Sequence, residues 1–489
     1  MSEDRIALGT ARGRWVLAAT ALGSGMAFLD GTVVNVALPA MGKDLNADMA
    51  GLQWIVNGYM LMLASLVLLS GSLGDRLGRR RTFVVGVIWF AAASIVCAIA
   101  PTLQIMIAGR VLQGIGGALL TPGSLAILQT TFQHSDRGKA VGLWSGLTSV
   151  AAAVGPFVGG TLVDSGSWQA IFLLNAPIAL VTVLVTLRHV PETRDESAGG
   201  KLDFSGAVLA TVGLAGFTYG LISAGDHGFS DPVVLASLLV GVIAFGGFIE
   251  VERRSSHPML PLSIFANRRF TGANLVTIVV YGALGTATFL VVVYLQTGLG
   301  YSALWAGASL LPMTALMLGL SGYAGGLSDR IGARIPMTVG PILMAGGFLL
   351  MLRIKPDGNY FTDVLPAVVL LGLGLVSTVA PLTATVLSSV DDHHAGIASG
   401  VNNAIARSAQ LMAVAAIPMA AGITGDAYRN PAAFHDGFGN ALWISAVLAV
   451  AGGVIAWVTL GDRGTLVPIH HHTHCAMEAP PYAHQKATA

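Results

Sequence analysis

The ten residues Gly71-Ser-Leu-Gly-Asp75-Arg76-Leu-Gly78-Arg79-Arg80 recur, in altered form, as Gly325-Gly-Leu-Ser-Asp329-Arg330-Ile-Gly332-Ala333-Arg334. Six of the ten positions are identical, and each copy directly follows a long apolar run. Self-similarity of this kind indicates two related structural units in one chain. The repeat decides the fold because it fixes how the apolar runs on either side of it are grouped.

The composition indicates a membrane protein. Of the 489 residues 54% are hydrophobic and only 10% are charged, against roughly 25% charged residues in an ordinary soluble domain. Fourteen predominantly apolar runs are each about the 20 residues that a helix needs to cross a bilayer. They lie at about 15–39, 52–74, 82–100, 103–127, 140–163, 168–187, 205–224, 232–249, 271–296, 303–327, 335–352, 364–388, 397–422 and 440–460. The sequence therefore predicts an all-α polytopic membrane protein with fourteen transmembrane helices.

The distribution of basic residues predicts the orientation of these helices. Of the 26 Lys and Arg residues, two lie within spans, and four lie in odd-numbered connections, namely Lys43, Arg353, Lys355 and Arg429. The others lie in the N-terminal segment, the even-numbered connections and the tail. Because cytoplasmic loops carry the excess of Lys and Arg, both termini are predicted to be cytoplasmic, in the inner (plasma) membrane. A formal net charge of +1 gives no field that would attract nucleic acid.

The spacing of the repeat predicts three membrane units. The two copies begin at residues 71 and 325, which is too far apart for six helices with short loops. Removing two spans within about 200–268 restores a six-helix offset. We therefore expect a six-helix bundle over 1–190, two inserted helices over 191–267, a second six-helix bundle over 268–463 and a cytoplasmic tail over 464–489. Parallel repeats are typical of transporters that bind their substrate between the halves.

Three charged residues lie well within the predicted spans, namely Asp30, Arg110 and Arg407. A charge at the bilayer centre costs about 2.5–3.5 kcal/mol on insertion scales, so such residues face the protein interior or a water-filled cavity. Asp30 lies nine positions before Pro39, and Arg110 lies seven positions after Leu103. At a rise of 1.5 Å per residue both lie roughly 10–14 Å below the outer ends of their helices. They can therefore meet at one depth.

Asp30 is the predicted proton carrier. A medium of low polarity favours its neutral acid, whereas an unshielded Arg110 nearby favours its carboxylate, so conformational change can load and release a proton. Two structural alternatives remain: a permanent Asp30–Arg110 ion pair that only clamps two helices, or a carboxylate held by the backbone of Gly31 and Thr32. Arg110 accordingly either tunes proton transfer or is purely structural.

Arg407 has no acidic neighbour within the spans of the second half, where Leu284 takes the place that the repeat assigns to Asp30. Its guanidinium must find carbonyl groups, water or a substrate anion, and structural hydrogen bonding is the competing interpretation. Since Asp30 is the sole embedded acid, neutral or monocationic amphipathic substrates are expected. The candidate residues of the substrate cavity, all polar and within spans, are Asn57, Tyr59, Gln113, Gln296, Asn402 and Arg407.

The sequence contains no motif of an ATP-driven or metal-dependent enzyme. A phosphate-binding Gly-x-x-x-x-Gly-Lys-Ser/Thr loop is absent from the sequence, so neither ATP nor another cofactor is expected. The run His470-His471-His472-Thr-His474-Cys475 contains metal-ligand residue types, but without a second cluster it is interpreted as a solvated tail. We expect no enzyme activity and no metal site.

Several motifs occur in an order that resembles a known family. They include Leu29-Asp30-Gly-Thr-Val-Val-Asn35-Val-Ala-Leu-Pro39, Arg110-Val-Leu-Gln113-Gly114-Ile-Gly116-Gly117 and Gly155-Pro156-Phe-Val-Gly159-Gly160. Together with the Gly71–Arg81 loop they resemble the fourteen-span drug:proton antiporters of the major facilitator superfamily. The resemblance implies a proton-coupled antiporter that exports amphipathic small molecules, such as drugs or antibiotics, by alternating access.

The resemblance also implies two conformational elements. One is a cytoplasmic gate that locks the outward-facing state, formed by Gly71, Gly74, Asp75, Arg76, Gly78, Arg79 and Arg80. The other is a hinge in the fifth span, formed by Gly155, Pro156 and Gly159. The alternatives are a basic anchor at the membrane surface for the first and simple helix packing for the second.

Two other functions remain open at this point. A dedicated exporter of one endogenous metabolite would have the same architecture. A non-transporting membrane receptor or scaffold on the same fold would keep the close helix packing but would not need Asp30 to exchange a proton.

Overall fold

A computed structural model describes residues 5–194, 202–256, 258–355, 358–390 and 395–461. The predicted His-rich tail lies outside these residues. The long helices of the first half are α1 (Ala11–Asp44), α2 (Met49–Leu77), α3 (Arg79–Ala98), α4 (Leu103–Thr131), α5 (His134–Asp164), α6 (Gln169–Leu173) and α7 (Asn175–His189). They are followed by the inserted pair α8 (Phe204–His227) and α9 (Pro232–Arg254). The last group is α10 (Arg268–Thr297), α11 (Ala303–Ala308), α12 (Leu311–Ile331), α13 (Arg334–Met351), α14 (Leu365–Ser388), α15 (Ala395–Ala420) and α16 (Pro431–Thr459).

The fourteen predicted spans are confirmed as helical segments. Thirteen segments are long and apolar enough to cross a membrane. The remaining predicted span, 397–422, coincides with α15, a helix of 26 residues that is not among those thirteen. Two spans are interrupted, since α6 is followed by α7 and α11 by α12. The helices also extend beyond the apolar runs. For example, α16 begins at Pro431, earlier than the predicted 440, because Asn430 caps the backbone N–H groups of Ala432 and Ala433.

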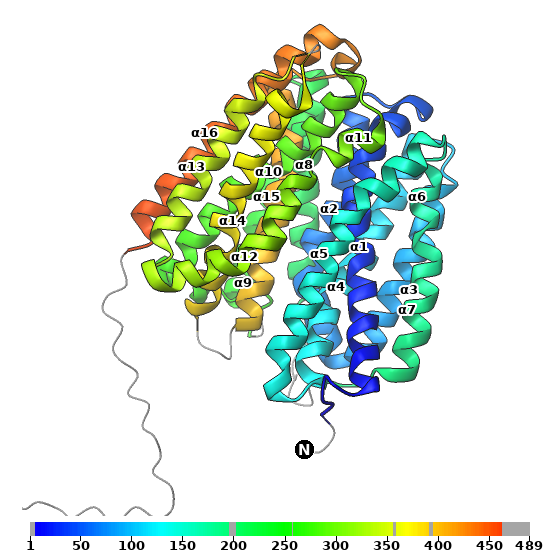
Figure 1. The fold of residues 1–489 in the computed structure, drawn as a ribbon, viewed down its shortest axis with the longest axis vertical. Helices are drawn as coiled ribbons and strands as arrows, with labels where there is room; N and C mark the ends of the chain where they lie inside the picture. The colour runs from blue at the N-terminus through cyan, green and yellow to red at the C-terminus, as the bar shows by residue number, and fades with distance from the viewer. Residues whose placement is uncertain (1–4, 195–201, 257, 356–357, 391–394, 462–489) are drawn as a thin grey trace, which may run out of the picture.

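The first six spans pack mainly on one another, as do the last six, which gives the two helix groups in Figure 1. Glycines permit the closest crossings. A side chain at Gly116 of α4 would lie 2.7 Å from the backbone nitrogen of Phe90 in α3, and one at Gly114 would lie 2.4 Å from the carbonyl oxygen of Tyr59 in α2. Small residues at such crossings let the helix backbones approach one another.

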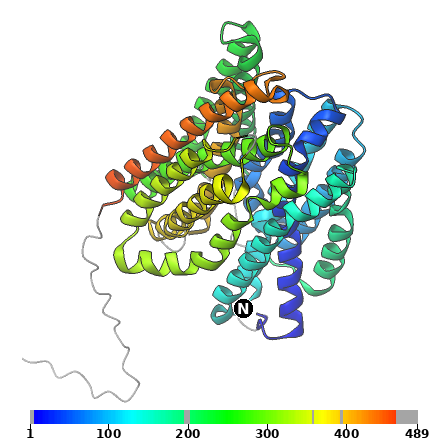
Figure 2. The same ribbon diagram turned by 45° about the horizontal axis from the view of Figure 1, so that its top comes forward.

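The inserted helices form a hairpin, in which α8 and α9 pack along each other and α8 also contacts α2 and α15. The hairpin therefore touches one helix from each half. Figure 2 shows it at the edge of the molecule rather than between the two groups. Between the hairpin and α2, α10, α15 and α16 lies an apolar cavity of about 580 Å³, whose polar lining side chains are Ser65 and Ser408.

Hydrogen bonds that join the halves gather where α1 ends, which we call the outer end. Gln53 Nε2 donates to the carbonyl of Val414 at 2.6 Å, and Gln296 Nε2 donates to the carbonyl of Val36 at 2.9 Å. Tyr428 donates its hydroxyl to the carbonyl of Ala47 at 2.7 Å. The two helix groups diverge toward the opposite, inner end, where α1 begins and α16 ends (Figure 1).

A carboxylate forms a further outer contact. Asp164, at the end of α5, accepts the backbone N–H groups of Ala303 at 2.9 Å and Leu304 at 3.1 Å. These donors are the first N–H groups of α11, which have no partner inside their own helix. The Asp164 side chain thus connects the first half directly to the second.

We predict that Asp164→Ala favours separation of the outer ends, because the free N–H groups of α11 are then satisfied only by water. Loss of charge-assisted hydrogen bonds of this kind costs about 1.5–3 kcal/mol. The measurement is the distance between spin labels at positions 165 and 302, which should shift toward longer values. Asp44→Ala is the matched control, since Asp44 accepts Trp168 Nε1 at 2.8 Å within the first half. An unchanged distance distribution for Asp164→Ala would contradict the role of this contact.

Candidate functional site

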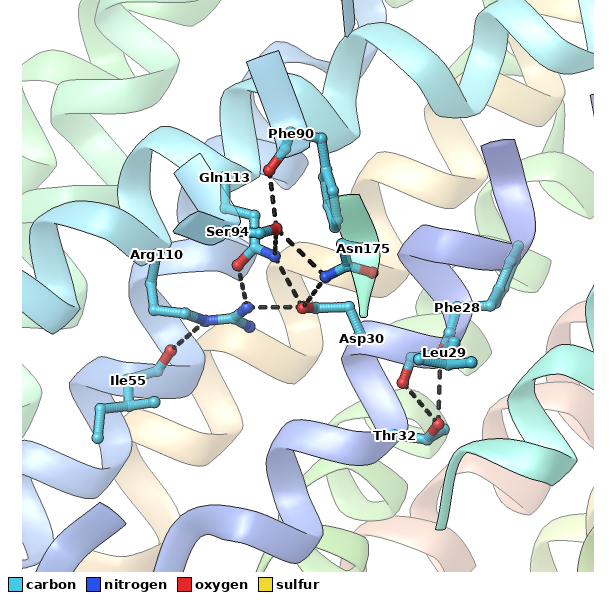
Figure 3. A network of polar contacts seen from close by, with 10 residues as sticks. All are labelled: Phe28, Leu29, Asp30, Thr32, Ile55, Phe90, Ser94, Arg110, Gln113 and Asn175. Carbon is cyan, nitrogen blue, oxygen red and sulfur yellow. Dashed lines mark hydrogen bonds and ion pairs between the residues drawn. The ribbon is translucent and has the colours of Figure 1, made fainter. Parts of the chain in front are cut away.

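Asp30 and Arg110 meet inside the first half (Figure 3). Asp30 Oδ2 lies 2.6 Å from Arg110 Nη1, and the two side chains are each 2% exposed. Arg110 Nε donates to the carbonyl of Ile55 at 3.0 Å. The ring of Tyr59 lies 4.6 Å from the Arg110 guanidinium carbon, and the ring of Phe172 lies 5.9 Å from it. The guanidinium is therefore enclosed by its counter-charge, a backbone carbonyl and two aromatic faces.

Three polar side chains complete this network (Figure 3). Gln113 Nε2 donates to Asp30 Oδ1 at 2.7 Å and to Ser94 Oγ at 2.9 Å, while its Oε1 accepts from Arg110 Nη1. Asn175 Nδ2 reaches Asp30 Oδ1 at 3.5 Å and Ser94 Oγ at 3.2 Å. The acid therefore faces only donors, contributed by α4 and α7. Such a surrounding fits the ionised carboxylate, since a protonated acid would have to displace one donor.

The sequence predicted that Asp30 and Arg110 can meet, and the structure places them in contact. The alternative in which backbone groups of Gly31 and Thr32 hold the carboxylate does not match the geometry, because side chains occupy both oxygens and Thr32 Oγ1 donates to Leu29. The sequence analysis missed Ser94 and Asn175. A polar side chain in an apolar span was their only signal in the sequence.

The six residues proposed for a substrate cavity do not gather in one place. Gln113 is fully buried in the Asp30 network, Tyr59 is 2% exposed and covers Arg110, and Gln296 is part of the outer contact. Asn402 Nδ2 donates to Asn274 Oδ1 at 3.0 Å and to Thr277 Oγ1 at 2.9 Å within the second half. For these four side chains, hydrogen bonds or packing already account for the polar groups in this conformation.

Asn57 differs from these four residues because its side-chain amide makes no hydrogen bond within the described part of the chain. The side chain is fully buried, and both its amide nitrogen and its oxygen have no hydrogen-bond partner among the described residues. It follows Gln53 by one helical turn on α2, the face that packs against α15. Two neighbouring amides on this interface thus have opposite effects: Gln53 stabilises the contact and Asn57 destabilises it.

Arg407 lies midway along α15 and is half-buried. Among the described residues no carboxylate pairs with it. Its helix α15 packs against α2 of the first half and against α10 of the second. Arg407 therefore lies between helices of the two halves, unlike Asp30 and Arg110, which are enclosed within one half.

The predicted inner loop is anchored to the first half itself. Asp75 pairs with Arg79 at 2.6 Å. Arg80 instead donates its backbone N–H to Glu192 Oε1 at 3.0 Å, and its Nε lies 3.6 Å from Glu192 Oε2. Gly78 has a φ of 107°, and a side chain there would lie 2.6 Å from Glu192 Oε1. Sequence reasoning missed Glu192. In contrast, Gly71 and Gly74 have no atom within 4 Å of an added side chain, so this face of α2 is open.

The predicted hinge glycines lie where three helices cross. A side chain at Gly155 would lie 2.1 Å from Thr32 Oγ1, and one at Gly159 would lie 2.7 Å from Val33 in α1. Pro156 packs against Gly307 of α11. In this conformation α5 continues through Pro156 as one helix. The crossing therefore joins α5 to α1 and to the second half, directly beside the turn of α1 that holds Asp30.

The comparisons with known proteins agree with this fold. Residues 20–414 match the sequence profile of the Major Facilitator Superfamily. The chain is 36% identical to the tetracenomycin C resistance and export protein of Streptomyces glaucescens over 80% of its own length and 73% of that protein. It is 34% identical to the methylenomycin A resistance protein of Bacillus subtilis (strain 168), covering 91% of this chain and 94% of the relative. The puromycin resistance protein pur8 of Streptomyces alboniger is also 34% identical, with 89% of each chain covered.

Solved structures share the fold at low sequence identity. A POT family transporter in complex with 5-aminolevulinic acid superposes with a TM-score of 0.70 at 13% identity, covering 94% of this chain and 98% of the other. A D-xylose-proton symporter gives a TM-score of 0.65 at 15% identity, with 92% and 98% covered. At this identity the likeness shows the fold alone.

These helices and this buried charge network define a multi-pass membrane transporter. The chain belongs to the major facilitator superfamily. The predicted resemblance to its drug- and antibiotic-resistance members is confirmed, and members of this family are transporters rather than enzymes.

The anchoring of the inner loop generates one prediction. Gly78→Ala should destabilise the protein by roughly 1–2 kcal/mol, because the backbone conformation is unfavourable for an L-residue and the new methyl group collides with Glu192. Gly74→Ala is the control, since its methyl group enters open space in a helix, where Ala is the better residue. Apparent melting temperatures of the purified variants should fall for Gly78→Ala and not for Gly74→Ala. Equal melting temperatures would refute this account.

The side-chain amides of Gln53 and Asn57 on the α2–α15 interface generate a second prediction. Asn57→Leu should stabilise this conformation, because it removes an unsatisfied buried amide whose desolvation costs about 1–3 kcal/mol. Gln53→Leu should have the opposite effect, since it deprives the carbonyl of Val414 of its donor. The distance between spin labels on the outer ends of α2 and α15 should shift toward shorter values for Asn57→Leu and toward longer values for Gln53→Leu. Shifts in the same direction for both variants would contradict the assignment.

Proposed function

We propose that this protein is a proton-coupled antiporter that exports amphipathic small molecules by alternating access between its two halves. In the proposed topology both termini are cytoplasmic, the outer end faces away from the cytoplasm, and the bundles 1–190 and 268–463 move against each other around the inserted helices 191–267. The names of the relatives, which include resistance and export proteins for antibiotics, support a cargo of this kind.

The observation that carries the proposal is the state of Asp30. The described conformation is closed at the outer end, and its two helix groups diverge at the inner end. In it the Asp30 carboxylate is paired with Arg110, and the polar groups that face it are hydrogen-bond donors. An antiporter must release its proton in this conformation. When the outer end opens, displacement of Arg110 removes the counter-charge of Asp30, which favours the neutral acid.

The driving force suffices for export. Moving one elementary charge across the membrane potential is worth about 2.3 kcal/mol per 100 mV, and the pH gradient adds about 1.4 kcal/mol per pH unit. Arg110 and Gln113 act as the switch in this scheme, because both bind the carboxylate directly. Ser94 and Asn175 hold the Gln113 amide and the acid in place.

The two conformational elements are assigned as gate and hinge. We propose that the open face around Gly71 and Gly74 receives a helix of the second half when the inner end closes, with Asp75 against the N-terminus of that helix. This arrangement would mirror the outer contact of Asp164 with α11. The crossing at Gly155, Pro156 and Gly159 is the proposed pivot, since it remains in contact with both halves.

The test uses proteoliposomes with an imposed pH gradient and an internal pH-sensitive dye. Cationic, neutral and anionic amphipathic compounds are added to wild type, Asp30→Asn and Asp44→Asn. Compound-dependent proton movement should fall about tenfold or more in Asp30→Asn, since the carrier group is lost. It should persist in Asp44→Asn, whose carboxylate lies at the exposed outer end.

Proton movement that survives in Asp30→Asn would place the carrier elsewhere and overturn the assignment. Response to one compound only would indicate a dedicated exporter of one metabolite. A wild-type protein that binds compounds but moves no protons would favour the receptor or scaffold alternative.

A further inference from the structure

The position of Arg407 bears on the chemical class of the cargo, and the inference rests on the proposed export function. The two faces of α15 differ in character. Ala404, Ile405, Ser408 and Ala409 face the apolar cavity beside the inserted hairpin. Asn403, Arg407 and Gln410 recur at the spacing of a single helix face and are absent from that lining. Gln410 packs against Gly285 of α10, so this second face turns toward α10, and α15 also packs against α2 of the first half.

Arg407 supplies a permanent positive charge at mid-depth. It lies 12 residues from the start of α15, which corresponds to about 18 Å of helix, and a guanidinium does not lose its proton in proteins. It is half-buried, and among the described residues no hydrogen bond or ion pair to a carboxylate satisfies it.

The Asp30 carboxylate, the acid that would attract a cationic cargo, is not accessible to a cargo in this conformation. Asp30 is 2% exposed, and its two oxygens are occupied by Arg110, Gln113 and Asn175. The expectation of a neutral or monocationic cargo assumed that Asp30 faces the cavity, and the geometry removes that assumption. Among Asp30, Arg110 and Arg407, it is therefore Arg407 that carries a charge on a helix between the two halves.

We propose that Arg407 binds the negatively charged group of an amphipathic organic monoanion. The planar guanidinium matches a carboxylate through two parallel hydrogen bonds, which a neutral amide or an amine does not reproduce. The apolar part of the cargo then lies along the helices that flank the site. Arg407 therefore selects for charge, while the surrounding helices accept varied apolar groups.

The experiment compares three matched probes, 4-butylbenzoate, 4-butylbenzamide and 4-butylbenzylamine, which differ in charge but share one apolar body. Their binding to the full-length protein in nanodiscs of zwitterionic lipid is measured by calorimetry, with empty nanodiscs subtracted. The wild type should bind the carboxylate about tenfold more tightly than the amide or the amine. Equal affinities, or preference for the amine, would overturn the proposal without any variant.

Variants then test the residue. Arg407→Gln should abolish the preference for the carboxylate, and Arg407→Lys should retain a weaker one, because it keeps the charge but loses the planar fork. Arg254→Gln removes one positive charge from an exposed side chain at the end of α9 and should leave the preference intact. If Arg407→Gln does not fold, the weaker preference of Arg407→Lys decides. A full preference in either Arg407 variant contradicts the assignment.

The outcome is separable from the proposed export function. If the amine drives proton movement that depends on Asp30 while the carboxylate does not bind, the antiporter stands and the anion site falls. If the carboxylate binds through Arg407 but no compound moves protons, the anion site stands and the antiporter falls.

Discussion

The ion pair between Asp30 and Arg110 is the interaction on which the first half depends. Separating two buried charges leaves an uncompensated ion in a medium of low polarity, and breaking such a pair by removing one partner typically costs about 3–5 kcal/mol. The helices α1, α3, α4 and α7 each contribute a group to the network around it. These helices are therefore held in one arrangement as long as the acid is ionised, and any proton that reaches Asp30 loosens several helix contacts at once.

The two halves share a fold but differ in chemistry. The first half encloses Asp30 and Arg110 in a saturated network, whereas the second has Leu284 where the repeat would place an acid and, midway along α15, the cation Arg407. A duplicated scaffold thus carries two different arrangements of charge: one bundle encloses an ion pair, and the other holds a guanidinium with no carboxylate partner among the described residues. The contact surfaces that close the outer end come from both, through Gln53, Asp164 and Gln296.

The sequence predicted the helices and the meeting of Asp30 with Arg110, because helical rise converts residue spacing directly into membrane depth. It did not predict Ser94, Asn175 or Glu192 as partners, because depth does not determine how each helix is rotated or which loop returns to it. For the same reason the proposed cavity residues proved to be dispersed: Gln113 turns inward to the acid, while Gln296 turns to α1. The capping of α11 by Asp164 was equally invisible, since it joins segments that are remote in sequence.

The glycine crossing of α5 has a mechanical consequence. From Gly160, which abuts Leu304 of α11, α5 runs about 26 residues to its start at His134, or about 39 Å at the helical rise of 1.5 Å per residue. A rotation of about 10° around the crossing displaces the far end by about 7 Å, while groups within a few ångströms of the crossing slide by less than about 1 Å. The crossing is thus a fulcrum near one end of a long lever. In the proposed alternating access, the fit at Gly155, Gly159 and Gly160 would therefore set the width of the opening at the inner end.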